Sequence, residues 1–175
     1  MNLKTQHLEA LMDAHGDYLK RTATMLTGDV QLAEDLTQET FISYYKHSDQ
    51  YKGIASHRTY LYRILMNHIK MHTRKHKNTP TSLDIGGVMA FENDLVATMD
   101  LQRALSTLSM DYQMVIWLHF YEDLTVVDIA KAVGITQSGV KMRLKRAKEQ
   151  LKLALSHQKN RNNEKGGVVY EAYTE

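Results

Sequence analysis

The chain has 175 residues, and its 22 Lys and Arg nearly balance its 20 Asp and Glu, so the net charge of +2 says little about partners. It contains no cysteine, which excludes a disulfide framework and a thiolate metal site and fits a reducing cytoplasm. Since no signal-like segment follows Met1 and no apolar run reaches about 18 residues, we expect a soluble, cytoplasmic protein.

Long helical periodicities and a single proline, Pro80, predict an all-α fold of two small helical domains. The first domain is expected over residues 1–77. Within it, Gly28 and Asp29 interrupt one helix and cap the next, and Ser56 can cap a third. The helices predicted here are Thr5–Met25, Val30–Lys46 and Ser56–Lys75.

The second of these helices carries an acidic patch edged with apolar groups. Glu34, Asp35 and Glu39 stand near Leu36 and Phe41 in the segment AEDLTQETFISYYK. A negative surface favours association with a positive one, so this patch suits a basic protein partner better than DNA.

The third helix is strongly basic, because residues 52–77 hold seven Lys or Arg, four His and no acid. Helical spacing places one group of polar and basic residues opposite the apolar face, namely Arg63, Asn67, Lys70, Arg74 and Lys77. Tyr51, Tyr60 and Tyr62 interleave with this stripe or lie beside it. A basic groove with stacking rings suits single-stranded nucleic acid. The alternative is that the tyrosines are ordinary core and rim residues.

Three histidines on the same helix raise the possibility of a metal site. His68, His72 and His76 follow one another at intervals of four residues, and two His four apart can chelate a transition metal. No Glu completes a zinc-hydrolase motif and no Cys is present. We therefore expect packed or phosphate-facing histidines, no metal and no cofactor. No catalytic triad or paired-carboxylate cleft is recognisable, so we do not expect an enzyme.

Residues 78–97, NTPTSLDIGGVMAFENDLVA, contain the proline, a glycine pair, three acids and no Lys or Arg. This segment is predicted to be a flexible acidic linker, because its turn formers interrupt any helical stripe. The second domain is expected over residues 98–157. The tail over residues 158–175 is predicted to be disordered.

The segment Leu124–Leu151 has the pattern of a helix-turn-helix. Thr125 can cap a short first helix, and Gly134 supplies the left-handed residue that ends it. The second helix has one buried stripe with i, i+4, i+7 and i+11 spacing, formed by Val140, Leu144, Ala147 and Leu151.

Five of the eight residues over 141–148 are Lys or Arg, and no acid stands between Asp128 and Glu149. A face that only needs to be soluble usually interleaves charges of both signs, since this gains favourable pairs. The imbalance favours a helix that enters the DNA major groove over the alternative, a merely solvated face.

Three segments together resemble the sigma-70 family of bacterial RNA polymerase initiation factors, in its small two-domain extracytoplasmic-function (ECF) group. LTGDVQLAEDLTQETFISYYK is similar to the family's polymerase-contact segment. YKGIASHRTYLYRILMNHIKMHTRK is similar to the segment that melts and reads the −10 promoter element. LSMDYQMVIWLHFYEDLTVVDIAKAVGITQSGVKMRLKRAK is similar to the module that reads the −35 element.

The resemblance implies roles for individual residues. For polymerase binding it implies Glu34, Asp35, Leu36, Gln38, Glu39 and Phe41. For the −10 element it implies His57, Arg58, Tyr60, Arg63, Asn67, Lys70 and Arg74, with the loop Ile54–His57 taking an extruded base. For the −35 element it implies Gln137, Ser138, Lys141, Arg143, Lys145 and Arg146.

The resemblance also implies a function and partners. The expected activity is to bind core RNA polymerase, direct it to −35 and −10 promoter elements and promote DNA melting. Promoter DNA would be bound as a duplex at −35 and as a single strand at −10. An anti-sigma factor is an expected further partner, and no small-molecule substrate is expected. The alternative is a helix-turn-helix regulator that acts without polymerase.

Overall fold

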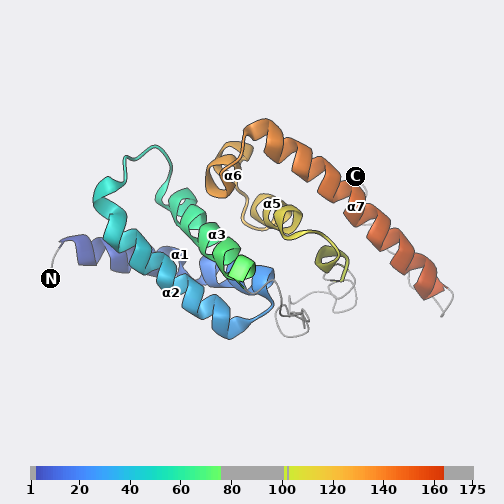
Figure 1. The fold of residues 1–175 in the computed structure, drawn as a ribbon, viewed down its shortest axis with the longest axis horizontal. Coiled ribbons are helices and arrows are strands. Elements are labelled where there is room, and N and C mark those ends of the chain that lie inside the picture. Colours follow the sequence, from blue (N-terminus) through green and yellow to red (C-terminus); the bar gives the residue numbers. More distant parts are fainter. Residues whose placement is uncertain (1–2, 76–100, 102, 164–175) are drawn as a thin grey trace.

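The computed structural model describes residues 3–75, 101 and 103–163, and the regular structure in these ranges is helical (Figure 1). The N-terminal block consists of α1 (Leu3–Thr27), α2 (Val30–His47), a short 3₁₀ turn η1 (Ser48–Gln50) and α3 (His57–Lys75). The C-terminal block contains α5 (Met110–Phe120), α6 (Val126–Val133) and α7 (Gln137–Asn163). The predicted all-α fold is confirmed.

Side chains at three helix starts make the capping bonds that the sequence predicts. The carboxylate of Asp29 accepts a hydrogen bond from the amide of Leu32 at 3.0 Å, which begins α2. The Ser56 hydroxyl accepts one from the amide of Thr59 at 3.1 Å, before α3. The Thr125 hydroxyl accepts one from the amide of Asp128 at 3.1 Å, before α6. Each bond satisfies an amide that has no partner inside its helix.

α1 and α7 extend beyond their predicted ends. α1 is two residues longer at each end than predicted. α7 continues to Asn163, so the prediction that disorder begins at residue 158 is wrong for residues 158–163. The sequence has no Gly or Pro between Gly139 and Gly166, and extending a formed helix is far easier than starting one. The predicted linker, His76 and Lys77 lie outside the described residues.

The core of the N-terminal block forms where α1, α2 and α3 pack together. It is built from fully or nearly fully buried apolar side chains, among them Leu19, Leu26, Leu36, Leu65 and Ile69. In the C-terminal block, α5, α6 and α7 pack around Met114, Leu118, Ile129 and Val140.

The two blocks also pack against each other. α6 lies along α3, and α5 contacts α1, so that α5 and α6 are placed beside the green α3 in Figure 1. The buried apolar residues of the two blocks form one continuous cluster. The two predicted domains therefore share a core in this structure, a feature that the sequence reasoning did not predict.

Candidate nucleic-acid and protein-binding surfaces

The helix-turn-helix forms as its sequence predicts. Gly134 has φ of 77° and ψ of 39°, and its amide donates to the carbonyl of Ala130 at 2.9 Å, which ends α6. Thr136 then caps α7 through a hydrogen bond from the amide of Gly139 at 3.1 Å. Val140, Leu144 and Ala147 are buried, so α7 presents its opposite side to solvent.

Most of the residues predicted to contact the −35 element lie together on that exposed side. These are Gln137, Ser138, Lys141, Lys145 and Arg146. Met142, exposed by 53%, lies among them. A basic helix surface of this kind can place charges at phosphates and polar groups at base edges.

Arg143 differs from the other predicted −35 residues. It is half-buried, and one terminal nitrogen, Nη1, lies 3.2 Å from a carboxylate oxygen of Asp111 in α5. At about 100° per residue, Arg143 falls at the border of the buried stripe. In this structure it therefore links α7 to α5 instead of extending from the exposed side with the other residues.

Only part of the predicted −10 stripe is exposed. Arg63, Asn67 and Arg74 on α3 are exposed and lie on one side of the helix. Lys70 is half-buried and donates a hydrogen bond to the carbonyl of Val133 in α6 at 3.0 Å. Burial lowers the pKa of Lys70. The nearby carboxylate of Asp111 raises this pKa, whereas the positive charges of Arg143 and Arg74 lower it.

The loop before α3 is held by a cluster of aromatic rings. The His57 ring lies 4.5 Å from that of Tyr51, and the Tyr60 ring lies 5.3 Å from Tyr51 and 5.9 Å from Tyr44. The Tyr51 hydroxyl donates to the carbonyl of Ala55. Tyr51 and Tyr60 are half-buried, which leaves part of their rings open for stacking.

Tyr62, by contrast, is a core residue with 1% exposure, as the alternative reading of the tyrosines expected. Its hydroxyl donates to Glu122 at 2.6 Å. Burial raises the pKa of Tyr62 well above its ordinary value of 10, and the hydrogen bond to Glu122 adds to the rise.

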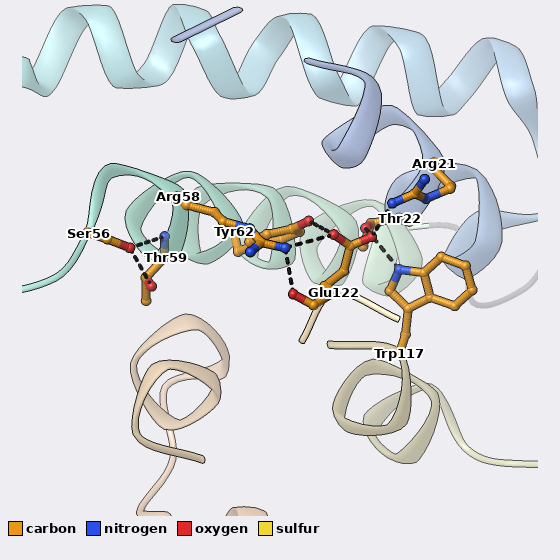
Figure 2. Close-up of polar contacts among 8 residues, drawn as sticks. All are labelled: Arg21, Thr22, Ser56, Arg58, Thr59, Tyr62, Trp117 and Glu122. Carbon is orange, nitrogen blue, oxygen red and sulfur yellow. Dashed lines mark hydrogen bonds and ion pairs between the residues drawn. The ribbon is translucent and has the colours of Figure 1, made fainter. Parts of the chain in front are cut away.

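Glu122 forms the centre of a polar cluster between the two blocks (Figure 2). Its side chain is fully buried, and it accepts hydrogen bonds from Arg21, Thr22, Arg58 and Tyr62. Arg58, one of the predicted −10 residues, thus points to Glu122 in this structure. Sequence reasoning missed Glu122, although an acid directly after the apolar run MVIWLHFY could have drawn attention to it.

The acidic face of α2 is confirmed as a surface, but its apolar members are not those predicted. Asp35, Gln38 and Glu39 are exposed, and Glu34 is half-buried, with Lys20 at 3.4 Å. Leu36 and Phe41 are each only 4% exposed and belong to the core. They were predicted to bind polymerase, but both lie on the side of α2 that packs against the other helices.

The exposed apolar residue next to the acids is Ile42, with 52% of its surface accessible. It lies four residues after Gln38 and three after Glu39, which places all three on one side of the helix. We define the α2 face as Asp35, Gln38, Glu39 and Ile42. Its carboxylates lie beside an exposed apolar side chain, which suits a partner surface whose basic groups surround an apolar one.

The histidines on α3 contact protein groups. The two ring nitrogens of His68 lie 3.0 Å from the hydroxyl of Ser43 and 3.5 Å from a carboxylate oxygen of Glu39. Within the described ranges, no group of three or more His, Asp or Glu is arranged to hold a metal ion. None of the helices in those ranges is long and apolar enough to cross a membrane.

The residues that form these surfaces lie in two segments that match known protein families. Residues 11–79 match the family model of sigma-70 region 2, and residues 98–151 match that of sigma-70 region 4. The ECF RNA polymerase sigma factor SigL of Mycobacterium tuberculosis is 31% identical over 156 residues, which cover 85% of this chain and 88% of SigL. SigW of Bacillus subtilis is 26% identical, with 83% and 87% covered.

Two solved structures have a similar fold. The sigma factor RpoE of Bartonella quintana, in complex with the anti-sigma factor NepR, gives a TM-score of 0.67 at 24% identity, with 87% of this chain and 96% of that chain covered. CnrH in complex with the cytosolic domain of CnrY gives a TM-score of 0.67 at 20% identity, with 87% and 90% covered.

Proposed function

The chain belongs to the ECF group of sigma-70 RNA polymerase sigma factors, and on this premise we propose that it binds core RNA polymerase and directs it to −35 and −10 promoter elements. The observation that carries the proposal is that one chain presents three separate surfaces. They are the basic side of α7, the exposed stripe of α3 and the acidic α2 face. A regulator that only binds duplex DNA has no use for the last two.

In the proposed mechanism, α7 lies in the major groove of the −35 element. Gln137 and Ser138, at its N-terminus, approach base edges, while Lys141, Lys145 and Arg146 bind phosphates or bases. This contact positions the N-terminal block over the −10 duplex.

The N-terminal block then opens the −10 duplex. Arg63, Asn67 and Arg74 follow the displaced strand, and the half-buried rings of Tyr51 and Tyr60 stand beside the loop that would receive an extruded base. Extrusion of a base costs a few kcal/mol, which contacts to the base and backbone must offset. No step requires the chain to catalyse a reaction, so we propose that it is an initiation factor and not an enzyme.

Core polymerase is bound by the α2 face, where exposed carboxylates surround Ile42. The cytoplasm is the proposed site of action, since polymerase and promoters are there. An anti-sigma factor is a further proposed partner, because the sigma factor RpoE of Bartonella quintana, which has a similar fold, is bound by the anti-sigma factor NepR.

Reconstituted transcription tests the proposal. Core polymerase, the purified chain and genomic DNA of the source organism should give RNA with discrete 5′ ends that core polymerase alone does not produce. Duplex binding by the chain without any such initiation would support the polymerase-independent regulator instead.

Charge variants at two surfaces, with one control variant, assign their roles. Asp35→Arg should abolish initiation by weakening binding to core, while Glu9→Arg, an equal charge reversal on exposed α1, should leave it intact. Lys145→Ala should keep core binding but weaken promoter binding and lower the salt slope by about one. Equal loss in Asp35→Arg and Glu9→Arg would show that only overall charge matters.

A further inference from the structure

One buried tyrosine joins the loop before α3 to two helices. Tyr44 of α2 has only 3% of its surface exposed, and Thr40 and Phe41, four and three residues earlier, are buried on the same side of the helix. Its hydroxyl lies 2.9 Å from Nδ1 of His57, the first residue of α3, and 3.3 Å from Nε2 of His7 in α1. A single hydroxyl is therefore shared by two imidazoles.

The bonding capacity of this hydroxyl limits the charge that the two histidines can carry. A phenol donates one hydrogen bond and can accept others, and a neutral imidazole has one donor and one acceptor nitrogen. With both rings neutral, Tyr44 can donate to one ring and accept from the other. Burial raises the pKa of Tyr44, and Tyr51 and Tyr60 add to the rise, so the hydroxyl keeps its proton.

Protonation of both rings is incompatible with this arrangement. Both nitrogens that face Tyr44 would then be donors, and neither could accept the proton of the hydroxyl. The ring centroids of His7 and His57 are 4.9 Å apart, so two positive charges would repel each other. Burial lowers the pKa of His57, and His7 lowers it further. A proton therefore binds His57 more readily when its ring is hydrated and away from His7.

The groups around His57 do not compensate a second positive charge. The titratable and charged side chains that face His57 or its loop from adjacent elements are His7 and His15 of α1, Tyr44 of α2, Tyr51 of the loop, Arg58 and Tyr60 of α3, and Lys131 of α6. Three acids of neighbouring segments bond to other groups, Asp49 to Lys4, Asp128 to Thr125, and Glu122 to Arg58. Within the described ranges, no carboxylate bonds to the ring of His7 or His57.

His57 connects Tyr44 to the rings that border the loop. The ring of Tyr51 lies 4.5 Å from that of His57, and its hydroxyl donates to the carbonyl of Ala55. The ring of Tyr44 also meets that of Tyr60 edge-on at 5.9 Å. Tyr51 and Tyr60 are the half-buried rings that the proposed function places beside an extruded base. Tyr44 thus acts on this stacking surface from within the core.

We propose that Tyr44 is a positioning residue for the −10 surface: its hydroxyl, shared by His7 and His57, holds the loop before α3 in the form that receives an extruded base, and protonation of both histidines releases the loop. The inference rests on the proposed function, because the loop is assigned there to the −10 strand. Protons bind the released form more readily, so a lower pH shifts the population toward it.

Loop mobility in the free chain gives the first test. Because the chain has no cysteine, a nitroxide at Lys52→Cys, an exposed loop position, reports on the loop alone. In this background Tyr44→Phe keeps the ring and removes the shared hydroxyl. Tyr45→Phe is the matched control, since the contact of Tyr45 with Lys4 is made by its ring. At about pH 7.5 the ratio of mobile to immobile label should rise about fivefold in Tyr44→Phe, the change expected for one lost hydrogen bond, and stay at the wild-type value in Tyr45→Phe.

A pH series separates positioning from a merely structural role. At about pH 5.5, below the ordinary histidine pKa, the mobile fraction of the wild type should approach that of Tyr44→Phe. His7→Gln should remain immobile at that pH, because the hydroxyl then faces only one ring that can become charged. His157→Gln, which changes an exposed histidine of α7, should follow the wild type.

Promoter opening gives the functional reading. Holoenzymes are compared on a promoter located by reconstituted transcription, with 2-aminopurine in the −10 element to report unstacked bases. At about pH 7.5, Tyr44→Phe should form about fivefold fewer open complexes than the wild type, with unchanged binding to core polymerase. Tyr45→Phe should form as many as the wild type.

Wild-type loop mobility in folded Tyr44→Phe would overturn the inference, and so would His7→Gln that becomes as mobile as the wild type at low pH. A mobile loop with undiminished open complexes would overturn the assignment of Tyr44 to the −10 surface. Should circular dichroism show that Tyr44→Phe does not fold, the comparison of His7→Gln with His157→Gln decides. If the wild-type chain initiates no transcription, the proposed function fails, whereas the mobility readings on the free chain still establish whether Tyr44 holds the loop.

Discussion

His57 is the residue at which three helices meet the loop before α3. Its Nδ1 lies 2.9 Å from the hydroxyl of Tyr44 in α2, and that hydroxyl lies 3.3 Å from Nε2 of His7 in α1. The Tyr51 ring lies 4.5 Å from the ring of His57 on the loop side, at an interplanar angle of 31°. Burial lowers the pKa of His57, and the neighbouring His7 lowers it further. The lowered pKa favours the neutral form of His57, which connects the helices and the loop.

The pKa of a second histidine, His15, is also lowered. Burial lowers the pKa of His15, and the charges of Arg58 and His57 add to the effect. A histidine whose pKa is lower in the folded chain makes the unfolded chain bind more protons below about pH 6.5. The stabilisation is therefore present above that pH and is lost as the pH falls toward the lowered pKa values.

We expect the free energy of unfolding, measured with urea, to fall between about pH 7.5 and about pH 5.5, and to fall less in His57→Gln. The glutamine keeps a polar group near Tyr44 but does not titrate. His157→Gln, which changes an exposed histidine, should retain the wild-type dependence. A decline in His57→Gln equal to that of the wild type would mean that other groups cause it.

At the scale of elements, the turn between α6 and α7 depends on backbone conformation. Gly134 has φ of 77°, in the left-handed region, and a Cβ built on it would meet nothing within 4 Å. Gly16, inside α1, likewise has nothing within 4 Å. The two glycines thus differ in backbone conformation and not in available space.

Substitution by alanine should therefore have opposite effects at the two positions. Gly134→Ala should lower the free energy of unfolding by about 1–2 kcal/mol, the cost of a left-handed conformation for a residue with a Cβ. Gly16→Ala should raise it by about 0.5–1 kcal/mol, because alanine loses less conformational freedom in a helix. Urea titrations of both variants measure the difference, and a change of the same sign in both would contradict this explanation.

At the scale of the whole molecule, the interface between the blocks differs from the core inside each block. Its centre is a carboxylate with polar and charged donors, whereas the block interiors are apolar. Separation of the blocks lets the charged groups regain their hydration and exposes only the apolar surface that the blocks share, whereas unfolding of a block exposes its own apolar interior as well. The interface should therefore open at a lower free energy than either block unfolds.

In a urea titration, the emission of Trp117 should accordingly shift at a lower denaturant concentration than the one at which helical circular dichroism is lost. The emission change should also have the smaller slope, since slope scales with the surface exposed. Coincident transitions would show that the two blocks unfold as one unit.

The sequence by itself determined the helices, their caps and the character of α7. Apolar spacing, the capping side chains of Asp29, Ser56 and Thr125, and the left-handed Gly134 act within a few residues of each other, so they can be recognised without tertiary context. The motifs that indicated the family are local in the same sense.

The tertiary structure alone decided which of the chemically suitable residues are exposed. Leu36 and Phe41 are in the core, and Arg143 faces Asp111, although each lies within a correctly predicted helix. Glu122 had no recognisable role until α1 and α3 supplied its donors, which are 60 or more residues away along the chain. Burial and pairing of this kind depend on groups that meet only when helices pack, and no local spacing encodes them.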